Sequence, residues 1–246
     1  MLMGYDRSVI VACDVSSDQV VSLVEATCDI PGIGGYKVGF RSLGGLDGLA
    51  KIVSQIQEVT RGFKPVIYDH QKAGNDIPAM GKEFARMLAE ADVQAAILFP
   101  FAGPATQKAW TEACQSIGAH QDEGINVLIG GHMTHDKFLA SEGGYIADDA
   151  PERIYRLAAE MGIRDFVVPG NKVEFVTKYR ELLESILGEG QFCLYAPGFV
   201  SQGGDISETG RAAGRKWHAI VGSAIYKAED PTAAAQKMVS QILAAD

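Results

Sequence analysis

The feature that most constrains the fold is a regular alternation of short apolar runs with longer helical patterns. Eight runs rich in Val, Ile and aromatic residues have the length of β-strands. They are residues 8–14, 34–40, 64–69, 93–100, 125–132, 164–169, 191–197 and 217–223. A segment with helical periodicity follows each run, and several of these segments begin with Asp, Ser or Pro, as helix N-termini do. This pattern indicates a parallel sheet covered by helices on its outside.

Eight strand–helix units in 246 residues predict an α/β fold, a single (β/α)8 (TIM) barrel domain spanning residues 1–246. A doubly wound open sheet is the alternative, but its Gly-rich dinucleotide fingerprint is missing after the first run, where residues 12–19 read ACDVSSDQ. Residues 133–149 are too many for a simple strand-to-helix turn. We expect them to form a functional loop with a short helix.

Composition excludes several classes of protein. The hydrophobic fraction of 47% and the charged fraction of 22% are typical of a soluble globular chain. The net charge of −9, without any Lys/Arg-rich block, argues against nucleic acid or an anionic membrane as the main partner. The start of the chain lacks the pattern of a signal peptide, and no stretch has the length of a membrane span, so we expect a cytoplasmic protein.

Polar residues at the ends of the strands are the candidates for chemistry, because barrel enzymes act at the carboxyl ends of their strands. Lys37 is the most informative, since GGYKVGF puts an ammonium group inside a strand that is buried on both faces. Such a charge must be paired or functional, unless the side chain snorkels to solvent. Asp14 and Asp69, which end neighbouring strands, are its expected partners.

A second cluster of charge follows the third strand, where residues 66–78 read VIYDHQKAGNDIP. Asp69, Lys72 and Asp76 alternate in sign, and with Asp14 and Lys37 they predict one network at the mouth of the barrel. In such a network the carboxylates keep the lysines protonated and the lysines keep the carboxylates ionised. A surface network of salt bridges is the alternative, but it explains the buried Lys37 poorly.

The segment after the seventh strand, PGFVSQGGD, has the composition of a phosphate-binding loop. Its glycines allow backbone N–H groups to approach an anion, and the last strand follows with another glycine, at the place where barrel enzymes often hold a phosphate. The residues expected there are Pro197, Gly198, Gln202, Gly203, Gly222 and Ser223.

Two histidines, His132 and His135, follow the fifth strand three residues apart. No carboxylate at ligand spacing completes a metal site, so we expect loop or hydrogen-bonding roles and no bound metal.

In this order along the chain, these motifs resemble the orotidine 5'-phosphate decarboxylase family. The motifs are YKVGF, the charged cluster ending in DIP, MTH after the fifth strand, PGFVSQGGD, and VGSAIY followed by DPTAAAQ. The resemblance runs from the first strand to the last helix. It implies a homodimeric (β/α)8 barrel with shared active sites that converts orotidine 5'-phosphate to UMP and CO₂, without metal or organic cofactor.

The resemblance also implies roles for individual residues. Asp69 would face the carboxylate of the substrate, and Lys72 would protonate the carbanion left at C6. Lys37 would link this network to the ribose hydroxyls, with Asp14 nearby, and Asp76 would reach into the site of the partner subunit.

Two further roles concern the base and the phosphate of the nucleotide. Thr134 stands where the family uses a Ser to bond the pyrimidine amide, and Gln202 would hold the phosphate.

Three departures from the family pattern are visible. The usual spacing is Asp-x-Lys-x-x-Asp, whereas the stretch from Asp69 to Asp76 carries one extra residue in each gap, which a bulge with Gly74 at the turn could absorb. In the family the last strand normally ends in Val-Gly-Arg, and this chain has Ser223 at the Arg position. The loss of this phosphate donor should weaken substrate binding, unless Arg211 or Arg215 substitutes for it. The Thr expected just after DIP is replaced by Ala79 or Met80.

Three other functions remain open. Hexulose-phosphate synthase and keto-gulonate-phosphate decarboxylase resemble the same motifs, but they carry an acidic residue in place of Lys37 and use magnesium. A catalytically silent nucleotide-phosphate-binding paralogue is suggested by Ser223 and the stretched cluster. A Schiff-base aldolase would need a lysine with a lowered pKa, and the flanking aspartates act in the opposite direction.

Overall fold

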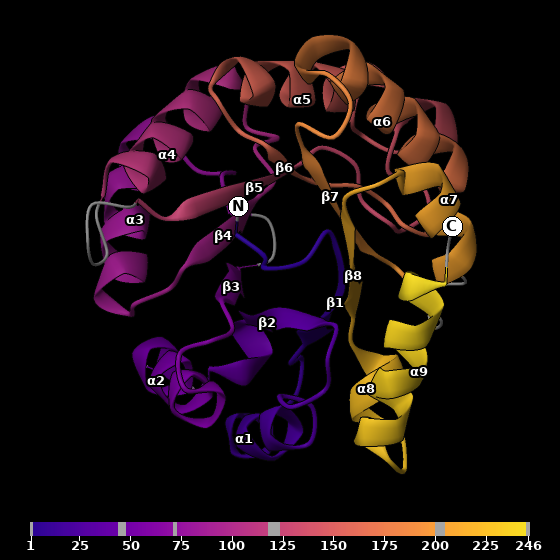
Figure 1. Ribbon diagram of the computed structural model, residues 1–246. Helices are drawn as coiled ribbons and strands as arrows, with labels where there is room; N and C mark the ends of the chain where they lie inside the picture. Colours follow the sequence, from indigo (N-terminus) through magenta and orange to yellow (C-terminus); the bar gives the residue numbers. More distant parts are fainter. Residues whose placement is uncertain (1, 44–47, 71–72, 118–123, 200–204, 245–246) are drawn as a thin grey trace.

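The computed structural model describes residues 2–43, 48–70, 73–117, 124–199 and 205–244. Within these ranges eight parallel strands pair in sequence order, and the eighth pairs with the first to close a barrel (Figure 1). The strands are β1 (Arg7–Ala12), β2 (Ile33–Gly39), β3 (Val66–Asp69), β4 (Ala95–Leu98), β5 (Asn126–Gly130), β6 (Asp165–Val167), β7 (Cys193–Pro197) and β8 (Trp217–Val221). The expected (β/α)8 barrel is therefore confirmed.

Helices form a ring around the outside of the strands (Figure 1). They are α1 (Ser17–Glu25), α2 (Leu49–Thr60), α3 (Gly81–Glu90), α4 (Pro104–Ser116), α5 (Ala150–Glu160), α6 (Val173–Leu187), α7 (Ile206–Ala213), α8 (Ser223–Tyr226) and α9 (Pro231–Leu243). Short 3₁₀ helices occur at η1 (Phe40–Ser42), η3 (Pro78–Met80) and η4 (Ala140–Glu142). The last of these is the short helix expected within residues 133–149. In the described parts of the chain, no helix is both long and apolar enough to cross a membrane.

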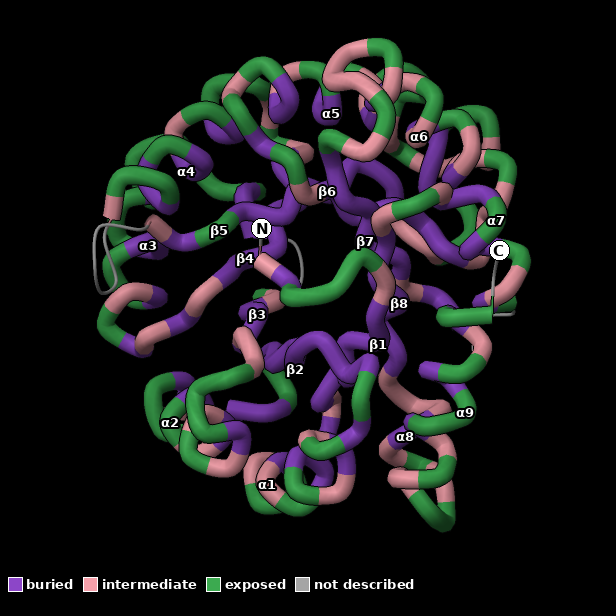
Figure 2. The backbone as a smooth tube through the Cα atoms, in the orientation of Figure 1, coloured by how far each residue is buried: buried purple, intermediate pink, exposed green. Residues whose placement is uncertain are grey.

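Apolar side chains alternate along each strand between two cores. In β1, Ile10 points into the barrel, where it belongs to a cluster with Ile67, Leu128 and Ile220. Its neighbour Val11 belongs to the larger cluster between the strands and the helices. Figure 2 shows the result as a ring of buried strands inside helices whose outer faces are exposed. Because both faces of the sheet are buried, the strands read as continuous apolar runs in the sequence.

Six of the eight strands end earlier than the apolar runs predicted, whereas β3 and β7 end at the predicted residue. Asp14 lies two residues beyond the end of β1, and His132 two residues beyond the end of β5. At these positions the backbone has left the ladder of the sheet, and the side chains line the mouth of the barrel. The helix α8 was not expected, because four residues are too few to show a helical period.

Candidate active site

A cavity of about 310 Å³ opens at the carboxyl ends of the strands, and all eight strands or the residues just after them contribute to its wall. Its apolar floor includes Ile97, Phe99, Val167 and Ile220. The polar and glycine positions of its wall are Asp14, Lys37, Asp69, His132, Thr134, Gly198, Gly222 and Ser223. An apolar floor under a few convergent polar groups is the usual design of a small-molecule site.

A larger cavity, of about 1200 Å³, lies at the opposite end of the barrel. Lys64, Gln94, Asn126 and Asp165 are among the residues that line it, all at or before the starts of strands. None of the residues expected at a site lines this cavity. Because barrel chemistry belongs to the carboxyl ends, the smaller cavity is the candidate active site.

Lys37 pairs with two carboxylates inside this cavity. Its Nζ lies 3.3 Å from Oδ1 of Asp14 and 3.1 Å from Oδ2 of Asp69. The register of the sheet explains the geometry: Lys37 is paired with Ala12 of β1 and Ile67 of β3, each two residues before one of the carboxylates. The backbone of Lys37 therefore lies deeper in the barrel than Asp14 and Asp69, and its long side chain extends to both carboxylates at the mouth.

The surroundings keep this ammonium charged. Burial alone lowers the pKa of Lys37, but the charges and hydrogen bonds of Asp69 and Asp14 outweigh burial, so that the net pKa is raised. The Lys37 side chain is only 7% exposed. A snorkelling lysine is thus excluded, and the structure shows a buried cation held by two acids from the neighbouring strands.

The loop after β3 is attached to its surroundings at several points. The carbonyl oxygen of Ala73 accepts a hydrogen bond of 2.8 Å from the N–H of Phe99, at the end of β4. Gly74 follows with a φ of +91°, which suits the residue expected to absorb the longer spacing of the cluster. His70 is exposed and turns to the hydroxyl of Tyr68, which belongs to the outer core and not to the cavity.

Asp76 does not line the cavity of its own chain. Its side chain is exposed and accepts a hydrogen bond of 2.7 Å from the N–H of Ile77. The backbone here is fixed by α4, since Thr106 donates to the carbonyl oxygen of Asp76 at 2.9 Å and Trp110 donates to that of Ile77 at 3.1 Å. The backbone of Asp76 is therefore held in a defined place, and its exposed side chain is not part of the cavity wall that includes Lys37.

The expected phosphate end of the cavity is described only in part. Pro197, Gly198, Gly222 and Ser223 line it, while Gln202 and Gly203 lie outside the described residues, as does Lys72, the expected proton donor at C6. Gly198 has a φ of +109°, and a Cβ there would lie 3.0 Å from Cγ2 of Thr134. Thr134 thus packs directly against the backbone that follows β7.

The two arginines considered as substitutes at Ser223 do not reach the site. Arg211 is exposed on α7 and does not line the cavity. The guanidinium of Arg215 lies 3.7 Å from Asp6, before the start of β8 and thus at the opposite end of the barrel. Among the described residues that line the cavity, Lys37 is the only Lys or Arg.

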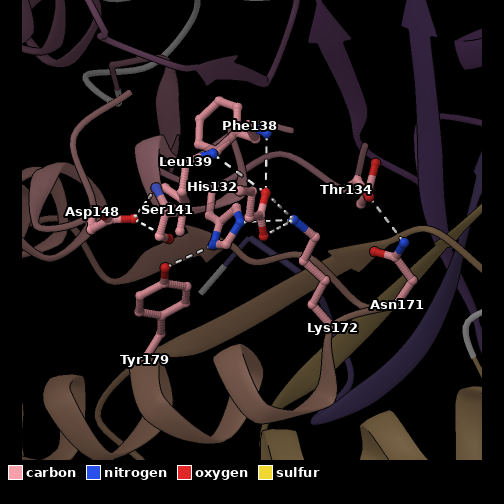
Figure 3. A network of polar contacts seen from close by, with 10 residues as sticks. His132, Thr134, Phe138, Leu139, Ser141, Asp148, Asn171, Lys172 and Tyr179 are labelled. Carbon is pink, nitrogen blue, oxygen red and sulfur yellow. Dashed lines mark hydrogen bonds and ion pairs between the residues drawn. The ribbon is translucent and has the colours of Figure 1, made fainter. Parts of the chain in front are cut away.

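His132 belongs to a hydrogen-bonded group that the sequence did not reveal (Figure 3). Its Nδ1 lies 2.8 Å from the hydroxyl of Tyr179, and its Nε2 lies 3.1 Å from Nζ of Lys172. Lys172 in turn lies 2.9 Å from Glu142. Lys172 lies five residues beyond the end of β6, just before α6, where the sequence alone gives no sign of its role. Among the described residues, no group of three or more His, Cys, Asp or Glu side chains is arranged to hold a metal ion.

Comparison with known proteins identifies the family. The model of the orotidine 5'-phosphate decarboxylase / HUMPS family matches residues 7–238. The chain belongs to this family. A curated member from Methanosarcina barkeri, named orotidine 5'-phosphate decarboxylase, is 31% identical over 234 residues, which cover 95% of this chain and 93% of the relative. A relative of the same name from Methanosarcina mazei is 29% identical and covers 98% of each chain.

Solved structures of decarboxylases in this family share the fold. The enzyme from Methanocaldococcus jannaschii, complexed with the inhibitor BMP, superposes with a TM-score of 0.79 at 22% identity over 96% of this chain and 98% of that one. The enzyme from Pyrococcus horikoshii superposes with a TM-score of 0.74 at 23% identity over 96% and 99%.

Proposed function

We propose that this protein is a cytoplasmic orotidine 5'-phosphate decarboxylase that makes UMP in pyrimidine nucleotide synthesis. Family membership over residues 7–238 and relatives of that name at about 30% identity support the activity. Residues 1–246 form one barrel domain. Its partner is a small nucleotide and not a nucleic acid or a membrane, in keeping with the net charge of −9.

The observation that carries this proposal is the buried Lys37 between Asp14 and Asp69. The family model also covers sugar-phosphate enzymes, which carry an acidic residue at the position of Lys37 and use magnesium. A fixed ammonium leaves no room for a divalent cation between the same two carboxylates, because like charges repel at such short range. The cavity therefore favours the decarboxylase over the sugar-phosphate enzymes.

The proposed reaction uses no cofactor. The carboxylate of the substrate lies against Asp69, the bond from C6 to this carboxylate breaks, and CO₂ leaves the electron pair on C6. Lys72 donates the proton that completes UMP. A cation next to the developing carbanion stabilises charge where it appears, and Asp69 keeps the substrate carboxylate in an unfavourable place that the transition state relieves.

The remaining residues bind the parts of the nucleotide that do not react. Lys37, with Asp14 nearby, holds the ribose hydroxyls, and Thr134 bonds the pyrimidine amide. Pro197, Gly198, Gln202, Gly203, Gly222 and Ser223 surround the phosphate. Because Ser223 provides a hydroxyl and not a guanidinium, we expect weaker phosphate binding than in relatives with Arg at this position.

The enzyme acts as a homodimer with shared active sites. Asp76 is exposed and does not line the cavity of its own chain, and its segment is fixed by Thr106 and Trp110 of α4. The adjoining side chains of Ile77 and Met80 are 61% and 42% exposed. An exposed carboxylate beside apolar side chains suits a surface that a second copy covers, with Asp76 entering the partner's cavity.

The direct test follows the loss of orotidine 5'-phosphate absorbance with purified protein. We expect turnover that persists in EDTA. A rate equal to that of buffer, despite measurable UMP binding, would show a silent binding protein instead. Activity that EDTA abolishes would contradict the cofactor-free mechanism.

A further inference from the structure

The group around His132 joins three separate parts of the barrel (Figure 3). His132 follows β5, Tyr179 lies on α6, and Lys172 lies just before α6. Glu142, in η4 of the long loop, accepts from Lys172 at 2.9 and 3.2 Å. The ion pair is partly buried, with the side chains 12% and 29% exposed.

Both ring nitrogens of His132 are committed within this group. Nε2 faces the ammonium of Lys172 and can only accept from it, so Nδ1 carries the proton and donates to the hydroxyl of Tyr179. The ring is neutral, and burial, with Lys172 next to it, lowers its pKa to about 4. Although His132 lines the cavity, it has no nitrogen left to exchange a proton with a ligand or to bind a metal.

The same group fixes the loop that begins with Thr134. Glu142 accepts hydrogen bonds from the N–H groups of Phe138 at 3.0 Å and Leu139 at 3.3 Å. The ring of Phe138 stacks on His132 with centroids 5.2 Å apart. Residues 138–142 are thereby tied to Lys172 at one end and to the cavity wall at the other.

Thr134 is held from the same side. Asn171, next to Lys172 in the chain, donates to the backbone carbonyl oxygen of Thr134 at 3.0 Å. The methyl group of Thr134 packs against Gly198. The position of Thr134 therefore depends on residues 171 and 172 and on the loop that Glu142 closes.

We propose that Lys172, Glu142 and His132 are positioning residues that hold Thr134 where it meets the base of the bound nucleotide, an inference that rests on the proposed function. A buried ion pair stabilises a fold little more than apolar side chains of the same volume do, because both charges lose their hydration. Its benefit is positional, because one ammonium group contacts Glu142 and His132 at the same time. That arrangement places the loop and, with it, Thr134.

The test combines variants in a double-mutant cycle on UMP binding. Lys172→Met removes the ammonium and keeps most of the length of the side chain, and Glu142→Gln removes the charge of its partner. We expect each to weaken UMP binding about tenfold, because a small displacement of a binding group loses most of its contribution. In the Thr134→Ala background the same changes should have less than about a twofold effect. Lys178→Met is the matched control, since Lys178 on α6 pairs with Glu152 on α5 and its side chain is 50% exposed.

A second measurement keeps the inference testable apart from catalysis. Hydrogen exchange of peptides covering residues 133–142 should be faster in Lys172→Met than in the wild type, with thermal melting showing that the barrel remains folded. The inference would be overturned if Lys172→Met lowered UMP affinity equally with Thr134 and with Ala at this position. Unchanged hydrogen exchange of residues 133–142 in Lys172→Met would overturn it as well. Wild-type protein that binds UMP but does not decarboxylate would contradict the proposed reaction and leave this test of positioning in force.

Discussion

The ammonium of Lys37 lies 3.1 Å from a carboxylate oxygen of Asp69, although the two residues are 32 positions apart in the chain. The register of β2 against β3 sets this distance, because Lys37 starts two residues below Asp69 and reaches up to it. The register of the two strands, and not the conformation of a loop, therefore determines this ion pair.

Lys37→Met should remove activity while the barrel still folds. The change leaves Asp14 and Asp69 without their shared cation, so we expect kcat/KM to fall about 10²- to 10³-fold. Initial rates of orotidine 5'-phosphate loss measure the effect. Lys51→Met, at an exposed position of α2, is the control and should leave kcat/KM unchanged. Near-normal activity of Lys37→Met would mean that Lys37 is structural only.

Gly198→Ala should weaken UMP binding and stability together. The φ of +109° strains any other residue, and the added Cβ would press on Thr134. Gly62→Ala is the matched control, because Gly62 has a φ of +72° with nothing within 4 Å of the added atom. Both changes should lower the free energy of unfolding by about 1 to 2 kcal/mol. Calorimetric titration with UMP should detect a loss of affinity only for Gly198→Ala.

Shared active sites can be tested by mixing two inactive variants. Asp76→Ala and Lys37→Met should each be inactive alone. In a mixed dimer one of the two sites receives both native residues, so random exchange of subunits should restore about a quarter of wild-type activity. No recovery, in a mixture that demonstrably forms mixed dimers, would place Asp76 outside the partner's site.

Ser223→Arg should strengthen phosphate binding. An arginine can form two parallel charge-assisted hydrogen bonds to a phosphate, which a serine hydroxyl cannot, and we expect the Kd of UMP to fall about tenfold. Ser54→Arg adds the same charge at an exposed position of α2 and controls for the change in net charge. If both variants bind UMP alike, the phosphate does not lie at residue 223.

Stability should depend on pH through His132. Its pKa is lowered to about 4 in the folded protein, mainly by burial and then by Lys172, whereas it titrates near about 6.5 when unfolded. The unfolded chain therefore takes up the proton first, and this contribution is complete above about pH 6.5 and is lost as the pH falls toward about 4.

In urea unfolding, His132→Gln should show a flatter decline across this window than the wild type. His135→Gln, at an exposed position of the same loop, should decline as the wild type does. Equal slopes for wild type and His132→Gln would show that His132 titrates normally. His218, whose pKa burial lowers to about 3, acts in the same direction in all three proteins and does not affect the comparison.

The barrel could be predicted from the sequence because each strand is buried on both faces and each helix on one, so the periods of the two patterns differ clearly. Lys37 could be predicted for a related reason, since a charge in such a strand is conspicuous. Lys172 and Glu142 could not, because each lies in a polar segment where a charge is unremarkable. Only the folded loop shows that they meet, 30 residues apart in the chain.

The attachments of the loop after β3 bear on how such sites are recognised across sequences. Ala73 is bonded to Phe99, and the carbonyl oxygens of Asp76 and Ile77 are bonded to α4, so the structure fixes where the loop is tied and not how many residues lie between Asp69 and Asp76. A search pattern with rigid gaps would reject this chain, whereas a comparison over its whole length accepts it. Residues can therefore be inserted between such tie points without moving the tie points themselves.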